Sequence, residues 1–132
     1  MGLDMYAYKA KKLMVDVPKF FDSEEAEKYI TVPDGNEFFY WRKHPNLHGW
    51  FQNLYMDNGG KDVFNCIYIE LTLEDLEELE EDLEMRKLPY TVGFCFGQST
   101  LEDKDFERDL DFVKKAKKAI KKGYSVYYTS WW

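Results

Sequence analysis

The sequence predicts an α+β fold in which a mostly antiparallel or mixed sheet of about four to five strands packs against about three helices. Strand-like alternating segments occur at both ends and in the middle of the chain, and three segments with helical apolar spacing lie between them. Neither a regular strand–helix–strand alternation nor a fixed-period repeat is present. The 132 residues, 45% hydrophobic and 18% aromatic, contain no linker, so we expect a single domain over residues 1–132.

The first expected strand covers residues 3–10, whose side chains alternate in character. One side carries Leu3, Met5 and Ala7, and the other carries Asp4, Tyr6 and Tyr8. Residues 11–36 contain two prolines and a turn sequence, and they predict irregular structure. At most a short helix is expected there, over residues 24–30 with Ser23 as its cap.

Residues 37–42 are rich in aromatic side chains and predict a strand. Pro45 suits the first position of a helix, which Asn58 and the two following glycines would end. The apolar residues of this helix have helical spacing, at Leu47, Trp50, Phe51, Leu54 and Tyr55.

Residues 63–71 predict a strand with apolar side chains on both faces, which favours an interior place in the sheet. A helix follows directly, with Thr72 and Asp75 as its capping box. Its apolar face carries Leu73, Leu76, Leu79 and Leu83, and Pro89 closes it.

Residues 90–96 predict a short buried strand or an extended loop between glycines. Thr100 with Asp103 is the expected start of the last helix, which Gly123 ends. We expect its core side chains to be Phe106, Leu110, Val113, Ala116 and Ile120. Residues 124–132 predict a final strand.

The net charge of −7 makes the chain a poor general binder of nucleic acid, because phosphate contacts need a basic face. No secretory signal and no membrane-spanning stretch is recognisable, and Cys66 and Cys95 lie in apolar contexts typical of buried free thiols. We therefore expect a cytoplasmic protein that does not enter membranes.

The helix of residues 73–84 is strongly acidic, which by itself predicts a solvated outer face that complements the helix dipole. Two alternatives stay open: a mimic of the nucleic-acid backbone, and a contact face for a protein partner. The partner-binding candidates are Glu77, Glu80, Glu81 and Glu84. The lysines near the end of the last helix could form a nucleic-acid patch, but acids of the same helix lie close by.

Phosphate-binding glycine loops, zinc-ribbon cysteine pairs and a nucleophile elbow are all missing from the sequence, so no cofactor is predicted. Residues 40–51 contain both histidines. His44 and His48 have the spacing of two metal ligands on one helix face, although Pro45 weakens that arrangement. The alternatives are structural histidines or a proton-transfer role, for which His48 is the catalytic candidate.

Arg42 and Lys43 precede an expected helix N-terminus, where backbone N–H groups favour an anion. A phosphate or carboxylate could bind there. The other interpretation is that Arg42 forms a structural ion pair with Asp4 or Glu37.

Four motifs in order along the chain carry a resemblance to a known family. They are residues 2–6 (GLDMY), residues 40–43 (YWRK) with 46–51 (NLHGWF), residues 93–99 (GFCFGQS) and residues 127–131 (YYTSW). Together they resemble a family of small bacteriophage and prophage proteins, with departures at Ala7, Leu47 and Gln98. The resemblance implies phage origin but no agreed activity, and it assigns no catalytic residue.

The polar residues of these motifs come from separate segments, and we expect them to line one pocket. The ligand-binding candidates are Asp4, Arg42, Lys43, Asn46, His48, Gln98 and Ser99. The leading hypothesis is a phage or prophage accessory protein that is not an enzyme and binds a host or defence-system protein, for instance as an anti-defence inhibitor. The alternative is a small enzyme or an anion- or metal-binding domain that uses His48, Arg42 and Asp4.

Overall fold

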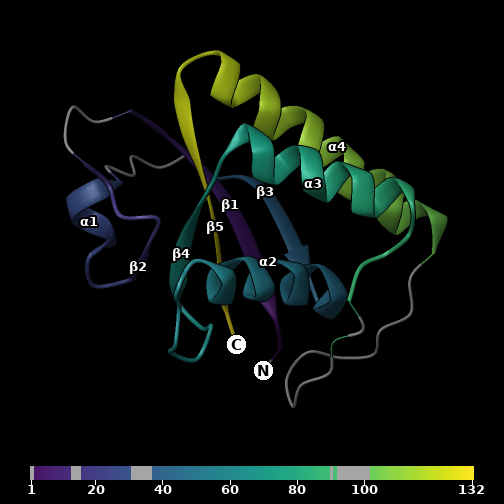
Figure 1. The fold of residues 1–132 in the computed structure, drawn as a ribbon, viewed down its shortest axis with the longest axis horizontal. Helices are drawn as coiled ribbons and strands as arrows, with labels where there is room; N and C mark the ends of the chain where they lie inside the picture. Colours follow the sequence, from purple (N-terminus) through teal and green to yellow (C-terminus); the bar gives the residue numbers. More distant parts are fainter. Residues whose placement is uncertain (1, 13–15, 31–36, 90, 92–101) are drawn as a thin grey trace.

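A computed structural model describes residues 2–12, 16–30, 37–89, 91 and 102–132. It contains a five-stranded sheet with the order β2-β4-β5-β1-β3, in which every neighbouring pair is antiparallel (Figure 1). The strands are β1 (Asp4–Lys11), β2 (Phe20–Asp22), β3 (Glu37–Arg42), β4 (Ile67–Leu71) and β5 (Tyr124–Trp131). The helices are α1 (Ala26–Tyr29), α2 (Pro45–Asp57), α3 (Leu73–Glu84) and α4 (Asp103–Lys121). The predicted α+β class is therefore confirmed.

The helices α2, α3 and α4 cover one face of the sheet, which we call the helix face (Figure 1). One side of the first strand was predicted to be apolar, and this side faces the three helices. Its residues Leu3, Met5 and Ala7 are fully buried there, as the alternation requires. Fully burying a side chain of the size of leucine contributes roughly 1.5–3 kcal/mol, so this layer is the main source of stability.

The opposite face of the sheet, which we call the open face, is covered at one end only. A second, smaller apolar cluster lies there. It contains Ala10 of β1, Phe21 of β2, Ala26 of α1, Ile30 directly after α1, and Tyr127 of β5. Figure 1 shows α1 and β2 together at that end of the molecule. The N-terminal half of β1 and the C-terminal half of β5 lie outside this cluster.

The start of α3 agrees with its prediction and the start of α4 does not. Thr72 Oγ1 accepts a hydrogen bond from the Asp75 N–H at 3.2 Å, and Asp75 Oδ2 accepts one from the Thr72 N–H at 3.0 Å. In α4 the N-cap is Glu102, whose N–H donates to Oδ2 of Asp105 at 2.8 Å. The predicted pairing of Thr100 with Asp103 was wrong, because Asp103 is already the first residue of the helix.

Two boundaries were also predicted wrongly. β4 begins at Ile67 rather than at residue 63, because Cys66 has a φ of 60°, which interrupts extended backbone. The short helix α1 follows Glu25 rather than Ser23, and its entry is a turn in which the Glu25 N–H donates to Asp22 Oδ1 at 2.9 Å. The strand β2 lies in the segment predicted to be irregular.

The buried side of α4 is wider than predicted, because it packs against both the sheet and α3. Phe112 and Ala119 are buried in addition to the predicted residues, whereas Leu110 and Ile120 are only half-buried. Phe112 packs edge-on against Trp41, with 4.7 Å between ring centroids. The last predicted strand is confirmed, and β5 lies at the centre of the sheet. No helix in the described part of the chain has an apolar stretch long enough to cross a bilayer.

Candidate functional site

Three strands bring polar and aromatic side chains together at the uncovered end of the open face. In the register of the sheet, Asp4 of β1 lies opposite Arg42 of β3 on one side and opposite Trp131 of β5 on the other. Residues directly opposite each other on neighbouring strands share a face. A cavity of about 360 Å³ lies here, lined by Gly2, Asp4, Arg42, Trp131 and Trp132.

Large aromatic side chains are exposed around this cavity. Trp131 is 64% exposed and Tyr40 is 45% exposed. The Tyr40 ring contacts that of Tyr6, with 5.3 Å between centroids, and Tyr6 stacks on Tyr8 at 6.2 Å. We call Asp4, Tyr40, Arg42 and Trp131 the open-face cluster.

Asp4 joins the polar groups of the open-face cluster. Its Oδ1 accepts a hydrogen bond of 2.5 Å from the Tyr40 hydroxyl and lies 3.9 Å from Nε of Arg42. The hydrogen bond to Asp4 is the main reason why the pKa of Tyr40 is raised to about 12, and desolvation adds to it. Of the two partners considered for Arg42, the structure shows Asp4.

The candidate Lys43 lies next to the same site. A Cβ added to Gly2 would come within 3.3 Å of Cε of Lys43, so a side chain at position 2 would crowd it. Lys43 itself has a φ of 53°, which ends β3 and turns the chain toward α2.

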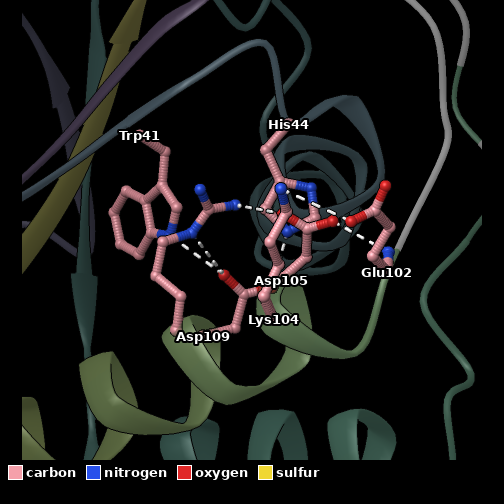
Figure 2. Close-up of polar contacts among 7 residues, drawn as sticks. Trp41, His44, Glu102, Lys104, Asp105 and Asp109 are labelled. Atoms are coloured by element: carbon pink, nitrogen blue, oxygen red, sulfur yellow. Dashed lines mark hydrogen bonds and ion pairs between the residues drawn. The ribbon is translucent and has the colours of Figure 1, made fainter.

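His44 belongs to a buried polar network on the helix face instead (Figure 2). Its Nε2 lies 2.5 Å from Oδ2 of Asp109, whose Oδ1 accepts a hydrogen bond of 3.0 Å from the indole of Trp41. The tautomer with its proton on Nε2 lets the ring donate to this carboxylate oxygen. Asp109 is fully buried, and these bonds tie β3 and the start of α2 to α4.

The catalytic candidate His48 is fully buried and lies on the other side of the sheet from Asp4. Its Nδ1 is 2.7 Å from the hydroxyl of Tyr128, and its ring stacks on Phe64. Burial lowers the pKa of His48 to about 4, so its imidazole is neutral at pH 7. In this position His48 completes the packing between α2 and β5.

The remaining ligand candidates do not reach the open-face cavity in the described structure. Asn46 is buried at the start of α2, where its Oδ1 accepts a hydrogen bond of 3.0 Å from the Thr91 N–H. The same Thr91 packs so closely on Gly49 that a Cβ there would overlap it. Gln98 and Ser99 lie outside the described residues, as do Cys95 and residues 90 and 92–96 of the expected strand, whereas Thr91 is described and lies in no strand.

Three of the four partner-binding candidates on α3 border two grooves, and Glu77 lines neither of them. Glu81, with Glu78 and Asp82, borders a groove of about 490 Å³ beside α2. Glu80 and Glu84 border a groove of about 680 Å³ beside α4, whose other lining residues are Leu110 and five lysines. Glu80 pairs with Lys117 there, at 3.2 Å.

The two histidines do not form the metal pair that their spacing suggested. His44 faces α4 and His48 faces β5. Within the described ranges, no group of three or more histidine, cysteine, aspartate or glutamate side chains could hold a metal ion.

Sequence reasoning missed Asp109 and the exposed part of the open-face cluster. Asp109 lies three residues after Phe106 and four before Val113, on the apolar side of α4. An acidic residue in that position indicates a buried, hydrogen-bonded carboxylate, and this signal could have found it. Tyr40 and Trp131 gave no such signal, because their motifs predict core residues as readily as surface ones.

No protein-family description, no curated protein and no solved structure was found to match this chain. The resemblance to small phage and prophage proteins therefore stays a prediction from the motifs.

Proposed function

We propose that this protein acts by binding another protein, and that the open-face cluster is the centre of the contact. The observation that supports this most strongly is the exposure of Trp131 on β5 and of Tyr40 beside Arg42 on β3, on either side of Asp4 of β1. Tryptophan, tyrosine and arginine are the residue types that contribute most to binding energy at protein interfaces.

The cluster is also held in place before a partner arrives. The hydrogen bond to Asp4 and the contact with Tyr6 restrict the Tyr40 ring, so little conformational entropy is lost on binding. The adjacent cavity of about 360 Å³ can take one apolar or aromatic side chain of the partner. Arg42, whose side chain is 61% exposed, can bind a carboxylate beside it.

The buried histidines favour binding over catalysis. His44 and His48 are 3% and 0% exposed, and each holds two elements of the fold together through its ring. A general acid or base must reach a substrate proton within hydrogen-bond distance, which these positions do not offer.

The partner we propose is a host or defence-system protein, because the resemblance to phage and prophage proteins implies phage origin. In that case this protein is a non-enzymatic accessory protein, for instance an anti-defence inhibitor. The acidic face of α3 contributes long-range attraction to a basic partner rather than the central contact. Its charge is partly compensated, because Glu80 is paired with Lys117.

Affinity capture from bacterial lysate tests the proposal with three baits: the wild type, Trp131→Ala and Met85→Ala. Met85 is also an exposed apolar residue, at 53%, but it follows α3 away from the open-face cluster. We expect the wild type and Met85→Ala to retain the same partner and Trp131→Ala to lose it. Equal capture by all three baits would contradict the proposal.

A small anion is the second candidate ligand, because Arg42 and Lys43 place two cations beside the cavity. Titration with inorganic phosphate, followed by tryptophan fluorescence, distinguishes the two. A saturable change that Arg42→Ala abolishes would favour an anion-binding domain, and its absence favours the protein partner.

A further inference from the structure

In the part of the chain that the structure describes, the β3 edge of the sheet is open to a further strand. β3 is the outermost strand beside β1, and its six residues include neither proline nor lysine, which commonly protect such edges. The strand at the opposite edge, β2, has only three residues. A short strand offers few backbone groups, so β3 is the edge at which pairing can continue.

The ladder between β1 and β3 shows which backbone groups are used within the chain. The Lys43 N–H donates to the Leu3 carbonyl at 2.8 Å, so these two residues form a hydrogen-bonded pair. Hydrogen-bonded and non-hydrogen-bonded pairs alternate along an antiparallel ladder. The next hydrogen-bonded pair is therefore Trp41 with Met5.

Tyr40 and Arg42 belong to the non-hydrogen-bonded pairs of the β1–β3 ladder. Their backbone N–H and C=O groups therefore point away from β1. Neither residue makes a backbone hydrogen bond to another segment within the described chain. The register irregularity in this ladder lies at the far end of β3, between the partners of Ala7 and Tyr8, so the stretch with Tyr40 and Arg42 is regular. Four backbone groups are thus presented to a strand outside the molecule.

We infer that β3 pairs antiparallel with β3 of a second copy of this chain, around a two-fold axis at Trp41. In this register each Tyr40 lies opposite Arg42 of the other copy, and both pairs are of the hydrogen-bonded type. Symmetry then gives four N–H···O=C bonds, and the two five-stranded sheets become one continuous sheet.

The side chains complement each other in the same register. Tyr40 and Arg42 are exposed on the open face, so each guanidinium comes to lie beside the Tyr40 ring of the other copy. Asp4, which holds the hydroxyl of that ring, adds a negative charge nearby. In the dimer each copy therefore contributes one Tyr40 ring and one Arg42 guanidinium, and the contact between the two forms twice.

The expected dimer is reversible. Two paired edge strands bury less surface than the roughly 1,200–2,000 Å² of stable interfaces. The dimer places two open-face clusters side by side, which would let it bind a two-fold symmetric partner at both sites.

Sedimentation of the full chain over a wide concentration range tests the inference, with Tyr40→Ala and Tyr40→Pro as a matched pair. Alanine keeps the outward N–H, whereas proline removes it without breaking a bond within the monomer. We expect the wild type and Tyr40→Ala to change from monomer to dimer as concentration rises. Tyr40→Pro loses two of the four bonds, and its association should be weaker than that of Tyr40→Ala by about tenfold or more.

A cross-link tests the register without proline. In a background with serine at Cys66 and Cys95, Tyr40→Cys protein is mixed with Arg42→Cys protein and oxidised. Opposite residues of a hydrogen-bonded pair lie about 5.5 Å apart at Cα, which suits a disulfide. We expect the mixed dimer to form faster than either homodimer.

A wild type that stays monomeric at millimolar concentration would overturn the inference, and so would equal association of the alanine and proline variants. Dimers without the mixed cross-link would overturn the register. The result does not depend on the proposed function, because Trp131→Ala should lose the partner protein and still dimerise.

Discussion

The Tyr40 hydroxyl donates a hydrogen bond to the Asp4 carboxylate across the β3–β1 pair, and this bond fixes the aromatic ring that borders the candidate contact site. Tyr40 lies on the edge strand and Asp4 on its neighbour, so the bond also connects the edge to the interior of the sheet. The open-face cluster is therefore a built surface rather than a set of mobile side chains.

The buried His48 makes stability depend on pH. Its pKa is lowered to about 4 in the folded state, whereas the unfolded chain has the ordinary value of 6.5, so only the unfolded state gains a proton between these values. The stability is complete above pH 6.5 and falls by about 3 kcal/mol as the pH drops to about 4. Urea unfolding at a series of pH values measures this loss. His48→Asn should show a clearly smaller loss in the same window, and an identical slope in both proteins would contradict the assignment.

Asp109→Ala should destabilise the protein by about 3–5 kcal/mol. The substitution leaves the Trp41 and His44 ring donors buried without their acceptor. Chemical denaturation measures the free energy of unfolding. Asp111→Ala, on the exposed side of the same helix, is the control and should change stability by less than about 0.5 kcal/mol. Similar values for the two variants would show that the buried network contributes little.

Leu79→Ala should cost roughly 2–5 kcal/mol, because Leu79 is fully buried and the substitution leaves a cavity between α3 and its neighbours. Glu78→Ala, the adjacent exposed position, is the control. Thermal unfolding of both variants measures the difference. A loss below about 0.5 kcal/mol for Leu79→Ala would mean that the apolar face of α3 is assigned wrongly.

Charge reversal on α3 should slow partner binding without abolishing it. In the variant with lysine at Glu77, Glu80, Glu81 and Glu84, we expect a lower association rate and a weaker salt dependence. The dissociation rate should change little, because the central contact that we propose lies on the other face of the sheet. Surface plasmon resonance measures both rates. Complete loss of binding would contradict this expectation and would indicate that the central contact lies on the acidic face of α3.

The strand positions were predictable where alternation was clear. The two sides of β1 follow directly from its sequence, and the opposed Asp4 and Arg42 were foreseen as a possible ion pair. The place of His48 was not predictable, because the spacing of residues shows which of them share one side of a helix but not which element that side packs against. Its ring points into the core at Tyr128, on the opposite side of the sheet from Asp4.

The ends of the elements were harder to predict than the elements themselves. Cys66 adopts a positive φ that no local sequence rule requires, and so β4 begins later than its apolar pattern suggests. The width of the buried side of α4 depends on its two neighbours, the sheet and α3. The helical spacing of apolar residues does not indicate tertiary contacts of this kind.

The dissociation constant of the captured partner for the wild type and for Trp131→Ala, measured by calorimetry with Met85→Ala as control, tests the central claim most directly. We predict that Trp131→Ala weakens binding by about 30-fold or more, which is the cost of removing a dominant interface residue. The control should bind like the wild type. Equal dissociation constants for all three proteins would place the contact elsewhere on the molecule.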